Sequence, residues 1–120
     1  MKEIYSPDRI AEMIMTIDPD FYLPSDEQRP IISIDTNPLE PAVVIAGAGS
    51  GKTETMAARV VYLVANQCAR PDQILGLTFT RKAAGELNTR IRKRLRQFQQ
   101  AQDKAGIERT FTSLETAVTT

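Results

Sequence analysis

The feature that most constrains this chain is a glycine-rich stretch at residues 46–53, which reads Ala-Gly-Ala-Gly-Ser-Gly-Lys-Thr. Ala42–Ile45, directly before it, is a continuous apolar run of the kind expected for a buried parallel strand. From Lys52 onward a helix is predicted, because four apolar residues recur at helical spacing: Met56, Val60, Leu63 and Val64. A strand, a tight loop and a helix in this order are the opening unit of an α/β fold.

Further elements surround this unit. Ser6-Pro7 predicts the start of one helix, and Ser25 with Gln28 has the spacing of a capping box that opens a short second helix. Residues 74–79 resemble a second strand, residues 81–102 a long helix ended by Gly106, and residues 111–120 are β-prone. We therefore expect an α/β fold with parallel strands joined by crossover helices. Two or three strands make an unfinished sheet, so we expect a truncated domain.

Length and composition exclude several classes of protein. A chain of 120 residues suffices for one small domain, and no apolar run approaches the ~18 residues that span a bilayer. The N-terminus lacks the apolar core of a signal peptide, so a cytoplasmic protein is expected. Cys68 is the only cysteine and histidine is absent, which excludes an intrachain disulfide and the commonest metal ligand. We interpret Cys68 as a small packing residue near a helix end.

The net charge is zero, but the charges are unevenly distributed. Residues 1–41 hold nine acidic and three basic side chains. Residues 81–96 hold seven basic side chains and the single carboxylate of Glu86. A local basic segment of this kind either forms a solvated helix face or contacts a polyanion, and for Arg90–Arg96 the sequence leaves both open.

The glycine-rich stretch matches the P-loop pattern, with alanine in place of its first glycine. Glycines let successive backbone N–H groups point at phosphate oxygens, and the following helix presents its positive end to the anion. Lys52 would reach the β- and γ-phosphates, and the Thr53 hydroxyl would be a ligand of Mg²⁺. A chance glycine-rich turn is the alternative, but the strand before it and the helix after it favour nucleoside triphosphate binding.

Three segments together resemble superfamily 1 DNA helicases of the UvrD/Rep type. Ala46–Thr53 resembles their motif I, Ile74–Leu87 their motif Ia and Pro24–Gln28 their Q motif, in matching order and spacing over residues 22–95. Arg81 stands where many relatives carry asparagine. The resemblance implies the N-terminal fragment of a first RecA-like domain with a three-layer P-loop NTPase fold. It divides the chain into an N-terminal helix and linker (1–24) and the RecA-like part (25–120).

The resemblance also implies a nucleotide site for ATP and Mg²⁺. Lys52 and Thr53 would be catalytic, Thr53 would ligate the metal, and Gln28 would hydrogen-bond the adenine edge. The alternative is that Gln28 serves only as a capping side chain, but its distance from the P-loop favours the adenine role. The residues implied to bind the nucleotide are Gln28, Ala46, Gly47, Ala48, Gly49, Ser50, Gly51, Lys52, Thr53 and Glu54. As a side chain, Glu54 is interpreted, like Glu86, as a surface helix carboxylate rather than a catalytic base.

The same resemblance implies a track for single-stranded DNA or a duplex–single-strand junction. Phe79, Thr80, Arg81 and Lys82 would lie on it, offering an aromatic face for a base and cations or a hydroxyl for phosphates. Alternatively, Phe79 is a core residue at a strand end. No Asp-Glu pair follows an apolar strand after the P-loop, and no arginine fingers of a second RecA-like domain are present. The fragment is therefore expected to bind ATP but to hydrolyse it slowly.

The expected function of the parent is an ATP-dependent DNA helicase or translocase in DNA repair or replication. Three alternatives remain open at this point. One is a different P-loop enzyme, such as a small kinase or GTPase. Another is a non-catalytic DNA-binding module with a vestigial P-loop, against which the intact Lys52 and Thr53 argue. The third is a RecB-like or nuclease-fused repair subunit.

Overall fold

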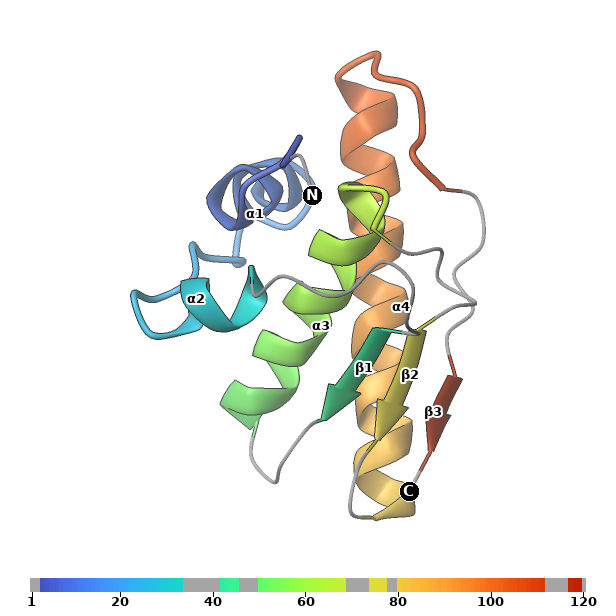
Figure 1. Cartoon of the computed structure of the whole chain (residues 1–120). Helices are drawn as coiled ribbons and strands as arrows, with labels where there is room; N and C mark the ends of the chain where they lie inside the picture. Colours follow the sequence, from blue (N-terminus) through green and yellow to red (C-terminus); the bar gives the residue numbers. More distant parts are fainter. Residues whose placement is uncertain are drawn as a thin grey trace.

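The computed structural model describes residues 3–33, 42–45, 50–68, 74–77, 80–111 and 117–119. Helices and strands alternate along most of this length (Figure 1). In chain order the elements are α1 (Pro7–Met15), α2 (Gln28–Ile32), β1 (Ala42–Ile45), α3 (Ser50–Ala65), β2 (Ile74–Leu77), α4 (Arg81–Lys104) and β3 (Ala117–Thr119). The helix predicted from Lys52 thus begins two residues earlier, and residues 78 and 79 of the predicted second strand lie outside the described residues.

The three strands form one parallel sheet in the order β1-β2-β3. Ala42 lies opposite Ile74, and Leu75 in turn lies opposite Ala117. Parallel neighbours need a crossover connection, and α3 and α4 occupy the two crossovers. The carboxyl ends of the strands therefore lie at one edge of the sheet, where α3 and α4 also begin (Figure 1).

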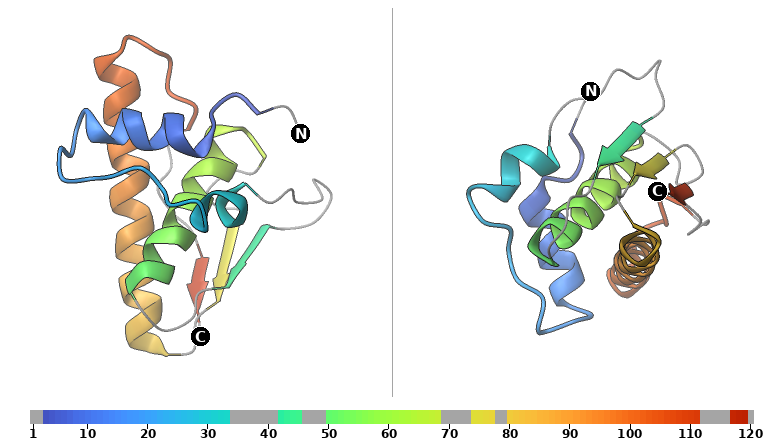
Figure 2. Two further views of the ribbon diagram at one scale, coloured as in Figure 1. Left: turned by 90° about the vertical axis from the view of Figure 1, so that its left-hand side faces the viewer. Right: turned by 90° about the horizontal axis from the view of Figure 1, so that it is seen from below.

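The predicted three-layer fold, with helices on both faces of the sheet, is wrong for the described residues. Helices dominate them: the four helices comprise 9, 5, 16 and 24 residues, against 4, 4 and 3 for the strands. Both views place α3 and α4 on the same face of the sheet (Figures 1 and 2). The reason is that α1 and α2 pack against these two helices rather than on the opposite face of the sheet. Only the parallel pairing agrees with the prediction.

Local signals set the helix ends. The Ser6 hydroxyl accepts a hydrogen bond from the backbone N–H of Arg9 at 3.0 Å, and Pro7 follows at the first helical position, as predicted. The Thr80 hydroxyl caps α4 in the same way, accepting from the N–H of Ala83 at 3.0 Å. After α4, Gly106 adopts a φ of 72°, a left-handed conformation that glycine tolerates and that commonly ends helices.

The described core is built largely between helices. The second half of α3 is buried around its whole circumference, because α1, α2 and α4 surround it. The predicted apolar stripe of α4 is confirmed at four of its five positions, Leu87, Ile91, Leu95 and Phe98, while Ala84 is half-buried. Cys68 packs partly buried against this core, as expected.

A buried asparagine fastens the N-terminal residues to α3. The side-chain oxygen of Asn66 accepts hydrogen bonds from the N–H groups of Ile4 and Tyr5, at 2.6 and 2.7 Å. Its amide nitrogen donates to the carbonyl oxygens of Tyr5 and Tyr62, both at 2.9 Å. Residues 3–15 therefore belong to the same packed unit as α3 and α4. None of the helices in the described ranges combines the length and apolar character that a membrane crossing requires.

Candidate nucleotide-binding site

The site predicted from the glycine-rich stretch lies where α3 begins. Ser50, Gly51, Lys52 and Thr53 form the first turn of α3, so their backbone N–H groups lie at its positive end. Thr53 is half-buried. Residues 46–49 of the predicted nucleotide loop lie outside the described residues. The described part of the site therefore consists of a helix N-terminus with a lysine and a threonine, which suits a phosphate with its metal ion.

Gln28 lies beside the second turn of α3. Its side-chain nitrogen donates to the Thr55 hydroxyl at 2.9 Å, across 27 positions of sequence. Its side-chain oxygen accepts from the N–H of Ser25 at 2.8 Å, while the Ser25 hydroxyl accepts from the N–H of Gln28 at 3.2 Å. The predicted reciprocal capping pair is thus present. An amide nitrogen carries two hydrogens, so the capping role still leaves Gln28 one donor for an acceptor such as a base edge.

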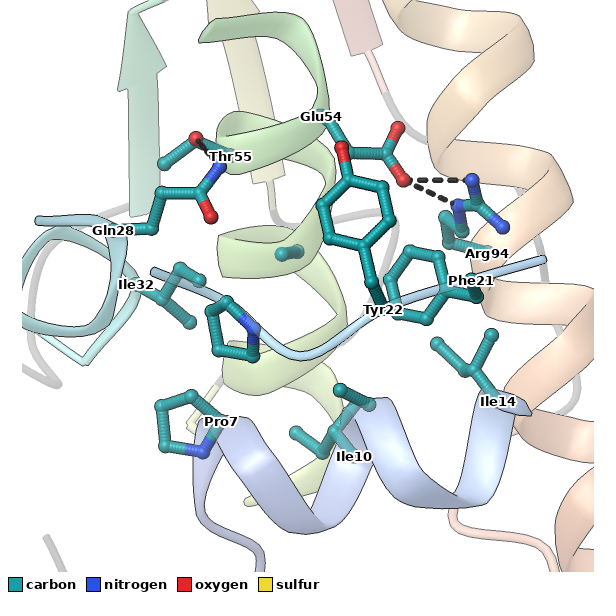
Figure 3. Close-up of a pocket in the computed structure, with 13 residues that line it drawn as sticks. Pro7, Ile10, Ile14, Phe21, Tyr22, Gln28, Ile32, Glu54, Thr55 and Arg94 are labelled. Carbon is teal, nitrogen blue, oxygen red and sulfur yellow. Dashed lines mark hydrogen bonds and ion pairs between the residues drawn. The ribbon is translucent and has the colours of Figure 1, made fainter. Parts of the chain in front are cut away.

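A mostly apolar pocket extends from Gln28 along α3 (Figure 3). Its cavity volume is about 30 Å³. The side chain of Tyr22 stands between the Gln28–Thr55 pair and the Glu54–Arg94 pair (Figure 3). The other lining residues come from α1, the segment before α2, and α2 and α3: Pro7, Ile10, Ala11, Ile14, Phe21, Pro24, Ile32 and Ala58. Its apolar lining with a few polar groups at the rim is the usual lining of a small-molecule site, but its volume is smaller than such sites have.

Glu54 is not the surface carboxylate that the sequence suggested. It is 9% exposed, and both of its oxygens are engaged by arginines of α4. Arg94 contacts one oxygen through Nε and Nη2, each at 2.7 Å, and Arg90 contacts the other at 2.9 Å. Helix propensity alone placed Glu54 on a surface, but the packing of α4 on α3 covers it. A buried carboxylate needs such paired, hydrogen-bonded partners because its desolvation is costly.

Arg94 connects Glu54 to the segment that precedes α2. Its guanidinium contacts Asp18 at 3.2 Å and lies 4.2 Å from the ring centroid of Phe21. Desolvation alone would raise the pKa of Asp18, but hydrogen bonds from Arg94, the Asp20 backbone and Gln97 outweigh it and hold this pKa below its usual value. One guanidinium thus holds together α3, α4 and one wall of the pocket.

The residues predicted to contact DNA lie at the start of α4. Thr80 caps the helix, and Arg81 and Lys82 are exposed in its first turn. Phe79 lies outside the described residues. Because the strands are parallel, α3 and α4 both begin at the same edge of the sheet (Figure 1). The structure therefore places the two predicted sites on neighbouring helix N-termini.

Sequence reasoning missed most of the residues that line the pocket, among them Phe21, Tyr22, Thr55 and Arg94. Phe21 and Tyr22 lie just before the Pro24–Gln28 segment. Two adjacent aromatic residues at this place were the available sequence signal for a pocket wall. Thr55 carried no such signal, because side chains two positions apart in a helix point to different sides and its spacing from Thr53 does not place it in the site. Arg94 belonged to the basic run whose orientation the sequence left open, and only its contacts reveal that it points inward.

Comparison with known proteins decides the family. A family model described as the UvrD/REP helicase N-terminal domain matches residues 25–118. The chain belongs to this family.

Curated members of the UvrD/REP family share substantial identity with the chain. DNA helicase IV of Escherichia coli K12 is 46% identical over 74 residues, which cover 52% of this chain and 11% of that protein. The ATP-dependent DNA helicase Rep of Buchnera aphidicola is 42% identical over 74 residues, 62% of this chain and 11% of that protein. PcrA of Staphylococcus aureus is 34% identical over 92 residues, 62% of this chain and 13% of that protein. The chain thus spans about a tenth of the length of these relatives.

Proposed function

We propose that this chain is the ATP-binding part of a DNA helicase or translocase, in which ATP binding and hydrolysis are coupled to movement along single-stranded DNA. One observation carries the proposal: the side-chain nitrogen of Gln28 lies 2.9 Å from the hydroxyl of Thr55, which is two residues beyond Thr53 in the helix that follows the glycine-rich stretch. The amide proposed to recognise the base therefore lies close to the helix start proposed to bind the phosphates. Relatives named ATP-dependent DNA helicases support the same conclusion.

On this proposal the residues at the start of α3 bind the phosphates. The backbone from Ala46 to Thr53 surrounds them, and Lys52 supplies a point charge for the β- and γ-phosphates. The Thr53 hydroxyl holds Mg²⁺, which neutralises charge on the phosphates when bound. The helix N-terminus adds a favourable field for the anion.

Gln28 reads the base in this arrangement. Its remaining N–H and the second lone pair of its side-chain oxygen offer a donor and an acceptor, the pair that the edge of adenine requires. Tyr22 and the apolar pocket wall lie next to it, where they would exclude water from a bound nucleoside. Adenine should therefore be preferred over guanine, whose edge presents the opposite pattern.

The start of α4 supplies the DNA contacts. Thr80, Arg81 and Lys82 combine a hydroxyl and two cations at a helix N-terminus, which suits the phosphates of a single strand. Phe79, immediately before them, would stack a base. The ion pairs of Glu54 with Arg90 and Arg94 join this helix to α3, so a shift of either helix is transmitted to the other.

The experiment that tests the proposal measures nucleotide binding by isothermal titration calorimetry, with a non-hydrolysable ATP analogue and Mg²⁺. Lys52→Ala is expected to weaken binding at least tenfold, because it removes a charge that contacts the phosphates. Lys104→Ala, at the far end of α4, is the charge-matched control and should bind as the parent chain does. Equal binding by the parent chain and Lys52→Ala, or tighter binding of GTP than of ATP, would contradict the proposal.

A further inference from the structure

The basic run of α4 divides into two sets of side chains. Arg90 and Arg94 turn inward to Glu54. Lys93 and Arg96 are exposed, as are Arg81 and Lys82 at the start of the helix. The outward positions repeat at helical spacing, so they share one side of α4: Lys82, Gly85, Glu86, Thr89, Lys93 and Arg96. This side, the outward face of α4, has no role in the described core.

A polar hollow lies on the outward face. It is lined by five residues, all of which carry hydrogen-bond donors: Asn88, Thr89, Arg92, Lys93 and Arg96. No carboxylate lines it. The nearest acidic residue on this part of the helix is Glu86, which does not belong to the hollow. Its exposed members, Lys93, Arg96 and Thr89, offer two cations and a hydroxyl, a donor set suited to phosphate oxygens.

A glycine also lies on this face, at position 85. Gly85 lies within α4, where glycine costs about 1 kcal/mol relative to alanine. A Cβ added at this position would meet nothing within 4 Å, so packing inside the described protein does not require the glycine. Close approach of a ligand to the helix backbone is a role for which glycine is used.

We propose that the outward face of α4 is a binding surface for the sugar–phosphate backbone of DNA, continuing the contacts that begin at Arg81 and Lys82. The proposal rests on the proposed function. It extends the DNA contacts from the start of α4 to about four turns of this helix. Lys82 and Arg96 are separated by 14 residues, or about 21 Å along the helix axis. A strand of duplex DNA places about six phosphates over that length.

A nucleic acid fits this surface better than an acidic peptide. The face carries three exposed cations, Lys82, Lys93 and Arg96, and the Thr89 hydroxyl against the single carboxylate of Glu86, a balance that favours phosphates. The exposed apolar residues that would anchor a peptide are absent from the hollow. The neutral overall charge of the chain makes this face, rather than the whole protein, the attractive element.

The test is the salt dependence of DNA binding, measured by fluorescence anisotropy with a labelled 20-nucleotide single strand and a 20-base-pair duplex. Lys93→Gln/Arg96→Gln should weaken binding and make the slope of log K against log salt shallower, by ~1.4 for single strands or ~1.8 for duplex. The probe whose binding changes, the single strand or the duplex, identifies the form of DNA that binds to this face. The control Lys104→Gln/Arg109→Gln removes the same charge from exposed residues at the other end of α4 and should leave the slope within ~0.3 of the parent's, because it removes no phosphate contact.

The variant Gly85→Gln distinguishes a loss of DNA binding from a loss of folding stability. It should raise the thermal unfolding midpoint, because glutamine is the better helix former, and lower DNA affinity, because a side chain now blocks the approach. Binding by Lys93→Gln/Arg96→Gln equal to that of the control would overturn the inference, and so would unchanged affinity of Gly85→Gln.

A third variant, Arg81→Gln/Lys82→Gln, distinguishes the two proposals. If it loses affinity while Lys93→Gln/Arg96→Gln does not, DNA binding at the helix start stands and the extended surface is wrong. If only Lys93→Gln/Arg96→Gln loses affinity, the outward face of α4 binds DNA and the proposed track at residues 79–82 is wrong. If the parent chain binds neither probe, both proposals are wrong.

Discussion

The guanidinium of Arg94 and the carboxylate of Glu54 face each other at 2.7 Å, 40 positions apart in the chain. Both side chains are almost fully buried. Glu54 directly follows the threonine predicted to hold Mg²⁺, and Arg94 lies on the helix that opens with the predicted DNA contacts. The pair therefore links α3, which carries the predicted nucleotide site, to α4, which begins with the predicted DNA contacts, and to the wall of the pocket.

Replacing Arg94 by methionine should strongly destabilise the protein. The change leaves the buried Glu54 with Arg90 alone, and breaking a buried pair costs about 3–5 kcal/mol. We expect about 3 kcal/mol of lost unfolding free energy, measured by urea denaturation, because Arg90 retains one contact. Arg96→Met, at an exposed position of the same helix, should change stability by no more than about 0.5 kcal/mol. Similar losses in the two variants would show that the ion pair is not structurally important.

Gln28→Ala should reduce the preference for ATP over GTP about tenfold, because it removes the amide proposed to read adenine. It should also remove half of the capping pair with Ser25. Ser25→Ala is the matched control, since it disrupts the same cap while keeping the Gln28 amide, and should lower stability by about 1 kcal/mol. Competition titrations with the two nucleotides measure the preference. An equal change in both variants would mean that Gln28 acts only as a cap.

Thr53→Ala should weaken ATP binding only when Mg²⁺ is present. The hydroxyl is proposed as a metal ligand, so its loss removes the contribution of the metal and leaves the backbone contacts to the phosphates intact. Calorimetry in Mg²⁺ and again in excess chelator measures both affinities. A loss of affinity of the same size under the two conditions would mean that the Thr53 hydroxyl acts through packing or contacts a phosphate directly.

Asp18 should contribute a pH-dependent part of the stability. Its pKa in the folded protein is below the ordinary value, so its contribution is present above the unfolded pKa of about 3.9 and is lost as pH falls through the folded value. Asp18→Asn should therefore lower the thermal midpoint at pH 6 and approach the parent chain in more acidic solution. Asp20→Asn removes the same charge two positions away and serves as the control. A constant difference at all pH values would exclude this linkage.

The sequence by itself determined the elements that rest on local chemistry. Ser6-Pro7 and Gly106 mark helix ends through capping and backbone conformation, and the Ser25–Gln28 spacing predicted a reciprocal pair that forms. The strand before the glycine-rich stretch and the family resemblance were likewise readable, because both depend on neighbours in the chain. The direction in which a helical side chain points depends instead on what packs against it.

Tertiary structure decided the rest. Glu54 and Arg94 have unremarkable local sequence, and only the packing of α4 on α3 buries them together. The same packing divided the basic run into an inward pair and an outward face, which composition could not do. It also gathered the helices on one face of a small sheet, where α1 and α2 bury apolar side chains against α3 and α4. Such choices depend on contacts between residues tens of positions apart, and no local pattern encodes them.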